Sequence, residues 1–65
     1  MDWRVQVQDW LRENERSQGY LAGRAGITRP YLNLCLLGKE QPREPVLHAL
    51  ESAMGLDHGA LGKAL

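Results

Sequence analysis

Hydrophobic residues recur along the chain with the spacing of amphipathic helices. Near the N-terminus one apolar stripe predicts a helix over about residues 3–14, and its members share one helical face: Trp3, Val7, Trp10 and Leu11. A second stripe predicts a helix that begins at Pro45 and ends at Gly55, and it consists of Val46, Leu47, Leu50, Ala53 and Met54. No segment shows the alternation that is typical of strands. We therefore expect an all-helical (all-α) chain.

Two shorter helices are predicted between these stripes, joined by a tight turn. Ser17 is a favourable N-cap for the first, which we expect to end at Gly26 because glycine adopts the left-handed conformation easily. Thr28 is placed to cap the second, whose first turn holds Pro30, where a missing N–H costs little. Gly38 is expected to end this second helix.

Two glycines lie inside the first of these short helices. Gly19 and Gly23 each cost up to about 1 kcal/mol relative to alanine at a helical position. Close approach of another chain segment is a common reason for glycine at such a position. We therefore expect a neighbouring stretch of backbone to pass near these two residues.

The remaining segments contain turn residues. Residues 38–44 are polar and include glycine and proline, so they are expected to form the longest loop. Asp57 is expected to cap a short fifth helix that carries Leu61 and Leu65. The chain of 65 residues is then a single domain of four to five helices.

Charge is distributed unevenly, although the net charge of the whole chain is zero. Residues 1–15 and residues 44–65 each carry a net charge of −2, whereas residues 16–43 carry five cations against Glu40 alone. This asymmetry indicates one surface that faces an anionic partner. An ordinary basic surface loop is the simpler alternative.

Several classes of function are disfavoured by the residue pattern. His48 and His58 have no cysteine or carboxylate at metal-ligand spacing, and no Ser, His and acid arrangement is visible, so no enzyme, metal or cofactor is expected. Neither a bilayer-spanning apolar run nor a signal peptide is present, so we expect a cytoplasmic protein without membrane contact. The lone Cys35 lies in an apolar run and is expected to be a buried, reduced thiol.

The order of these residues resembles the Cro and lambda-repressor-like (XRE-type) family of helix-turn-helix DNA-binding proteins. The matching positions are Ser17-Gln18, Leu21-Ala22, Ala25-Gly26-Ile27, Tyr31-Leu32, Gly38-Lys39, Pro42, Leu47, Leu50 and Met54-Gly55-Leu56. They span residues 17–56, and residues 1–14 suit the family's first helix. The resemblance implies a compact lambda-repressor-like domain whose helix-turn-helix unit covers about residues 17–38.

The resemblance also implies which residues hold the phosphates of double-stranded DNA. The glutamine that opens the second helix bonds a phosphate in this family, and here that residue is Gln18. Thr28 and Arg29 stand at the next helix start, where the helix dipole favours an anion. Lys39 and Arg43 would bind neighbouring phosphates. For Thr28 the capping role alone is a sufficient explanation.

The recognition helix, residues 28–37, would lie in the major groove. By family position, its base-reading face corresponds to Arg29, Pro30, Asn33 and Leu34, with Leu37 at its far end. Arg29 would bind O6 and N7 of guanine and Asn33 would bind N6 and N7 of adenine, each pair contributing about 1–3 kcal/mol of discrimination. Leu34 would contact a thymine methyl group.

Two features depart from the family and open an alternative function. Pro30, Leu34 and Leu37 form an apolar stripe where polar side chains are usual, and Glu51 replaces a common alanine. An exposed apolar stripe often marks a contact with another protein. The alternative is therefore a protein–protein interaction module on the same scaffold, with Tyr31, Leu34 and Leu37 as its surface.

The first hypothesis is sequence-specific DNA binding by a small transcriptional regulator of a phage, plasmid or bacterial host. A Cro-like repressor, an antitoxin-like autoregulator and a DNA-binding segment of a longer protein all fit it. A homodimer on two half-sites about 34–36 Å apart is expected, because one domain contacts few base pairs. We expect the dimer surface in the fifth helix, through Leu61 and Leu65, or in the loop before the fourth; alternatively, these leucines close the monomer core.

Overall fold

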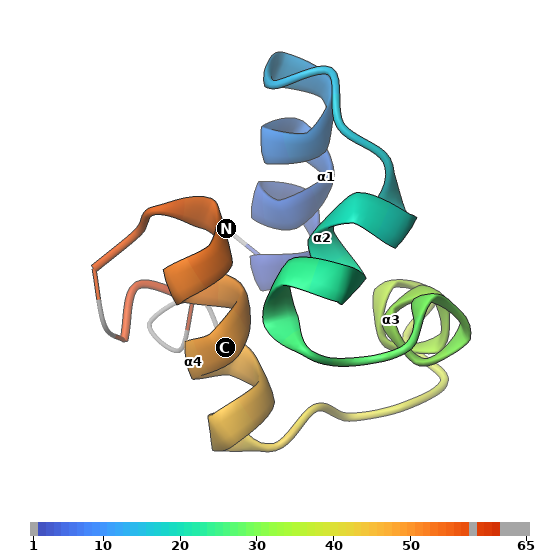
Figure 1. Ribbon diagram of the computed structural model, residues 1–65. Helices are drawn as coiled ribbons and strands as arrows, with labels where there is room; N and C mark the ends of the chain where they lie inside the picture. The colour runs from blue at the N-terminus through green and yellow to red at the C-terminus, as the bar shows by residue number, and fades with distance from the viewer. Residues whose placement is uncertain (1, 58, 62–65) are drawn as a thin grey trace.

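Four helices follow one another in the computed structural model, which describes residues 2–57 and 59–61 (Figure 1). They are α1 (Trp3–Glu13), α2 (Gln18–Ala25), α3 (Arg29–Leu36) and α4 (Glu44–Met54). No strand occurs in these described ranges, so the expected all-helical chain is confirmed. The two long predicted helices agree with α1 and α4 to within about one residue at each end.

The two short helices begin with the predicted side-chain caps. Ser17 Oγ accepts a hydrogen bond from the backbone N–H of Tyr20 at 3.1 Å, and Thr28 Oγ1 accepts one from Tyr31 at 3.2 Å. Each bond satisfies one of the backbone donors that a helix start leaves without a partner in the helix. Helix α4 has no such cap, but Pro45 stands in its first turn as predicted.

Glycine ends two of the helices by turning the chain sharply. Gly26 after α2 has φ 75° and Gly55 after α4 has φ 74°, both in the left-handed region that side chains disfavour. At the first turn, the N–H of Ile27 donates to the carbonyl of Ala22 at 2.9 Å, which fixes the direction of the chain toward α3. These two glycine positions were predicted and are confirmed.

Glu15, between α1 and α2, is the non-glycine residue with a positive φ in the described part of the chain, at 53°. A side chain there costs about 1–2 kcal/mol. We expect Glu15→Gly to raise the free energy of unfolding by a few tenths to about 1 kcal/mol, since glycine's larger unfolded-state entropy offsets part of the gain. Unfolding in urea measures this change in the free energy of unfolding. Glu15→Ala removes the same charge but keeps Cβ, so it should give no such gain; an equal gain would assign the effect to charge.

One hydrophobic core joins all four helices. Its buried members are Trp3, Val7, Leu11, Leu21, Ala22, Leu32, Cys35, Leu36, Leu47, Leu50, Met54 and Leu61. Helix α2 packs against both α3 and α4 and so connects these two helices. The Cα radius of gyration is 10.3 Å. A compact chain of this length is expected to have about 11 Å.

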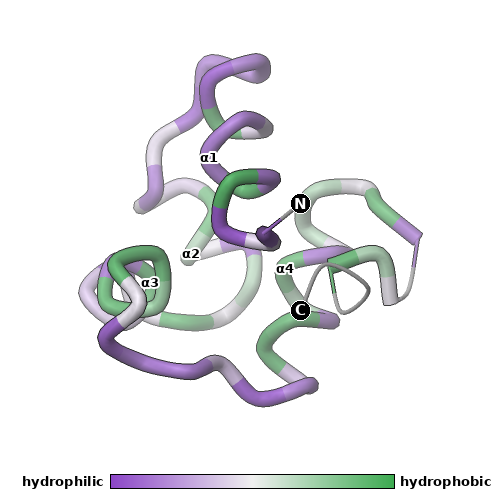
Figure 2. The backbone as a smooth tube through the Cα atoms, turned by 180° about the vertical axis from the view of Figure 1, so that it is seen from behind, coloured by the Kyte–Doolittle hydropathy of each residue, from purple (hydrophilic) through white to green (hydrophobic). Residues whose placement is uncertain are grey.

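The loop between α3 and α4 follows the surface, as predicted for residues 38–44. It comprises residues 37–43, and Figure 2 shows it as a mostly hydrophilic stretch between two helices that carry hydrophobic residues. Pro42 is the buried residue of this loop. The proline therefore holds the loop against the domain while its neighbours face solvent.

The expectation that a backbone segment approaches Gly19 and Gly23 is wrong. A Cβ at Gly19 would meet only side-chain atoms, Arg29 Cδ at 3.6 Å and Ser17 Oγ at 3.8 Å, and one at Gly23 would meet nothing within 4 Å. The reason is that α2 packs on its neighbours through Leu21 and Ala22, whereas Gly23 faces solvent.

The segment after α4 also differs from the expected fifth helix. Residues 59–61 form a turn, and Leu61 is completely buried in the core, so it closes the monomer core and is not available to a dimer surface. The physical cause is Glu51, whose carboxylate accepts hydrogen bonds from the backbone N–H groups of Gly59 at 2.9 Å and Leu61 at 2.7 Å. Leu65, the other predicted dimer residue, lies outside the described residues.

Candidate nucleic-acid interface

Helix α3 has one buried face and one solvent face. Leu32, Cys35 and Leu36 point into the core. The opposite face is exposed and holds the residues predicted to read bases: Arg29, Pro30, Asn33, Leu34 and, just beyond the helix, Leu37. This division follows from the helical repeat, because residues four apart share a face and residues two apart do not.

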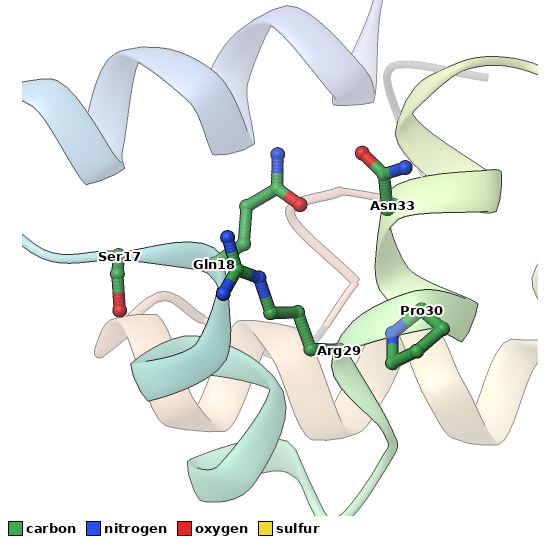
Figure 3. Close-up of a pocket in the computed structure, with 5 residues that line it drawn as sticks. All are labelled: Ser17, Gln18, Arg29, Pro30 and Asn33. Carbon is green, nitrogen blue, oxygen red and sulfur yellow. The ribbon is translucent and has the colours of Figure 1, made fainter.

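An open hollow lies where the start of α2 meets the start of α3. Its volume is about 580 Å³, and it is lined by Ser17, Gln18, Arg29, Pro30 and Asn33. In Figure 3 the side chain of Arg29 extends from the start of α3 to the start of α2, where Gln18 lies, and Asn33 stands on α3 on the same side. Four predicted site residues are thus brought to one place, and Ser17, which the sequence indicated only as a cap, joins them.

The turn between α2 and α3 determines this arrangement. Gly26 reverses the chain after α2, and Thr28 has an extended backbone conformation directly before α3 begins. The N-terminal residues of both helices, Gln18 and Arg29, therefore line the same hollow. Both helix starts carry the positive end of a helix dipole, so the hollow favours an anion.

Backbone donors contribute little to this site at the start of α3. Pro30 has no N–H, and the N–H of Tyr31 donates to the side chain of Thr28. Thr28 is therefore the cap of α3, and its phosphate contact stays a prediction. An anion here would be bound chiefly by the side chain of Arg29.

The Arg29 side chain crosses over α2. Its Cδ lies 3.6 Å from the position that a Cβ on Gly19 would occupy, so the absence of a side chain at Gly19 leaves room for the aliphatic part of the arginine. The ion pairs found among the described residues, Arg4 with Asp2 and Arg12 with Asp9, both lie at α1. Arg29 forms none with the described residues, so its charge is available to a partner.

The other predicted phosphate contacts lie apart from the hollow. Lys39 and Arg43 are exposed on the loop between α3 and α4 and do not line it. They extend the basic surface beyond the C-terminal end of α3. Arg16, near the start of α2, places its guanidinium over the ring of Tyr20 at 4.5 Å. This contact orders a further cation on the same part of the molecule.

The apolar surface proposed for a protein partner is smaller than expected. Tyr31 is only half-exposed and packs against the core, because its place on α3 lies at the edge of the buried face. Leu34 and Leu37 remain exposed, at 38% and 59%. Cys35 is buried as predicted, and burial raises the pKa of its thiol.

A second hollow lies between α1 and the end of α4. It measures about 240 Å³ and is lined by Gln6, Asp9, Trp10, Glu13, Met54 and Leu56. Its charged residues, Asp9 and Glu13, are acidic, whereas the charged residue of the first hollow is Arg29. The two hollows thus differ in the sign of the charged side chains that line them.

Comparison with family models, characterised proteins and solved structures found no match to this chain. None of the described helices is long and apolar enough to span a membrane. In the same part of the chain, no three His, Cys, Asp or Glu side chains gather as a metal site.

Proposed function

We propose that this chain is a sequence-specific DNA-binding protein that acts as a small transcriptional regulator. In this proposal α2, the Gly26 turn and α3 form a helix-turn-helix, and α3 lies in the major groove. The observation that carries the proposal is the grouping of Gln18, Arg29 and Asn33 around one open, basic hollow at the start of two helices. These are the residue types that bind phosphates and base edges.

The dimensions of α3 suit a major groove. With its side chains an α-helix is about 10–12 Å across, and the groove is about 12 Å wide, so it admits one α-helix. The eight residues of α3 extend about 12 Å along the helix axis. Arg29 and Asn33 are four residues apart, which separates them by about 6 Å along the helix axis. This corresponds to about two base-pair steps of 3.4 Å, so the two residues would read bases that are close neighbours in one half-site.

Phosphate contacts would flank this reading face. Gln18, at the start of α2, stands at one end of the face, and Lys39 and Arg43 follow its other end on an exposed loop. Phosphate contacts at both ends would hold the helix along the groove and fix its register. A homodimer on two half-sites remains part of the proposal, as does a role as repressor or autoregulator in a bacterial or phage-infected cell, where it would be cytoplasmic.

The test begins with selection of a preferred duplex from a random-sequence library by the purified protein. On that duplex, we expect Arg29→Ala to weaken binding by about 1–3 kcal/mol and to relax the preference at one guanine. Lys39→Ala should instead weaken all duplexes about equally and reduce the slope of log affinity against log salt by about one. Titration of each variant at two salt concentrations measures both effects.

Arg24→Ala is the matched control for Arg29→Ala. Arg24 is an exposed arginine at the end of α2 and does not line the hollow. Arg24→Ala removes the same charge as Arg29→Ala but away from the hollow, so it should leave the base preference intact. Equal loss of preference in both arginine variants would contradict a reading role for Arg29. No binding of any duplex at low salt would refute the proposed function.

The exposure of Leu34 and Leu37 favours the second candidate, a protein–protein interaction module on the same scaffold. In an interface, truncation of a buried leucine anchor costs about 2 kcal/mol or more. Enrichment of no duplex, together with loss of a bound protein in Leu34→Ala, would establish this second candidate in place of the first.

A further inference from the structure

Two leucines stand in solvent at the far end of the same α3 face. Leu34 is 38% exposed and Leu37 is 59% exposed. The N–H of Leu37 donates to the carbonyl of Asn33 at 2.9 Å, so Leu37 continues the helical geometry beyond the last residue of α3. Leu34 and Leu37 are therefore neighbours at i and i+3, and their side chains form one small apolar surface.

This leucine pair is continuous with the residues proposed to read bases. Arg29, Asn33 and Leu37 follow one another at intervals of four, and Pro30 and Leu34 form the adjacent row. The buried residues Leu32 and Leu36 lie on the opposite side. A partner that meets Arg29 and Asn33 therefore also meets the leucine pair.

The major groove offers an apolar group of matching kind. Thymine carries a C5-methyl group there, and the other groups on the base edges are hydrogen-bond donors and acceptors. A 5-methylcytosine places the same methyl group at the same position of its ring. A leucine against such a methyl group removes both from water, which is favourable, whereas a leucine against bare polar edges gains nothing.

We propose that Leu34 and Leu37 read C5-methyl groups, so that this protein prefers duplexes with a methylated pyrimidine beside the bases read by Arg29 and Asn33. The inference rests on the proposed function. It predicts that the affinity for DNA depends on cytosine methylation. Its ligand class is a duplex that presents C5-methyl groups, from thymine or from 5-methylcytosine, in the major groove.

The size and setting of the pair favour DNA over a protein partner. A stable protein interface covers about 800 Å² on each partner, and two leucine side chains provide only a small part of that area. The residues around the pair are exposed and polar, including Asn33, Lys39 and Glu40. A small apolar contact set among polar groups matches a methyl group on a base edge.

The spacing along the helix predicts where the methyl groups lie. Leu37 is eight residues from Arg29, which is about 12 Å along the helix axis, or three to four base-pair steps of about 3.4 Å. The methylated pyrimidines should therefore lie within about four steps of the guanine read by Arg29. They should lie on the same side of that guanine as the adenine read by Asn33.

The experiment uses the duplex selected by the full chain, with each thymine replaced in turn by deoxyuridine. This change removes only the methyl group and keeps base pairing. Burial of one such carbon is expected to change affinity about four-fold, so we expect about a four-fold loss at one or two positions in the predicted window. Where a cytosine is placed at those positions, 5-methylcytosine should bind about four-fold more tightly than cytosine.

The leucine variants connect this effect to the protein. In Leu34→Ala or Leu37→Ala, the ratio of thymine to deoxyuridine affinity should fall to about one at the corresponding position. Val5→Ala truncates another exposed apolar side chain, on α1, and should leave the ratio unchanged. Circular dichroism confirms that each variant is folded.

Two results separate this inference from the proposed function. Sequence-selective binding with no dependence on methyl groups, or with a dependence that survives both leucine variants, would overturn the inference and leave the proposed function standing. Failure of the wild-type chain to bind any duplex would overturn both.

Discussion

Leu32→Ala and Leu50→Ala should each lower the free energy of unfolding by about 2–5 kcal/mol. Both side chains are completely buried, one on α3 and one on α4. A core in a chain of this length rarely supplies more than about 3–5 kcal/mol in total. Each variant is therefore expected to be largely unfolded at room temperature, which a thermal melt followed by circular dichroism will show.

Leu34→Ala is the matched control for the core variants. It makes the same truncation in the same helix as Leu32→Ala, but at a side chain that is 38% exposed. Its melting temperature should stay close to that of the wild type, since alanine also favours the helix. A wild-type melting temperature for Leu32→Ala and Leu50→Ala would mean that the core lies on other faces of these helices.

The second large effect is expected at Glu51, a carboxylate that is only 1% exposed. It accepts hydrogen bonds from the N–H groups of Gly59 and Leu61. Hydrogen bonds to a charged group contribute about 1.5–3 kcal/mol each. We expect Glu51→Ala to cost roughly 3 kcal/mol or more, because both N–H groups lose their acceptor and the segment that holds Leu61 in the core is released.

Hydrogen exchange provides the local measurement for this prediction. The amides of Gly59 and Leu61 should lose protection in Glu51→Gln, whose side chain has one carbonyl oxygen in place of two carboxylate oxygens. Glu44→Gln makes the same change at an exposed position in the first turn of α4 and should leave both amides protected. Unchanged protection in Glu51→Gln would show that other contacts hold the segment.

The starts and ends of the helices were predictable because their signals are local. Ser17 and Thr28 cap helices through a backbone N–H three residues away. Gly26 and Gly55 end helices through their own backbone conformation. Neither feature depends on distant parts of the chain, so the sequence alone contains the necessary information.

The role of Glu51 was not predictable by such means. The sequence marked Glu51 only as a departure from the resemblance. A glutamate side chain is usually exposed, so its burial was not expected. Its partners are eight and ten residues further along the chain, and only the folded chain brings their N–H groups to the carboxylate. The burial of Leu61 follows from the same contact, which is why Leu61 closes the monomer core, the alternative to its expected dimer role.

The candidate site shows the same division between local and distant information. Helical periodicity places Arg29 and Asn33 on one face, and the turn at Gly26 brings Gln18 to them, so this group was predictable. Lys39 and Arg43 lie in a loop, where no periodic pattern determines the direction in which a side chain points.

We expect duplex DNA to bind to the face formed by the starts of α2 and α3. The most direct measurement is an NMR titration of the isotope-labelled chain with the selected duplex at low salt, followed through its backbone amides. We expect the largest shifts at Gln18, Arg29, Asn33 and Leu34, with little change around Trp10. Absence of shifts, or shifts confined to α1 and the end of α4, would show that this face does not bind duplex DNA.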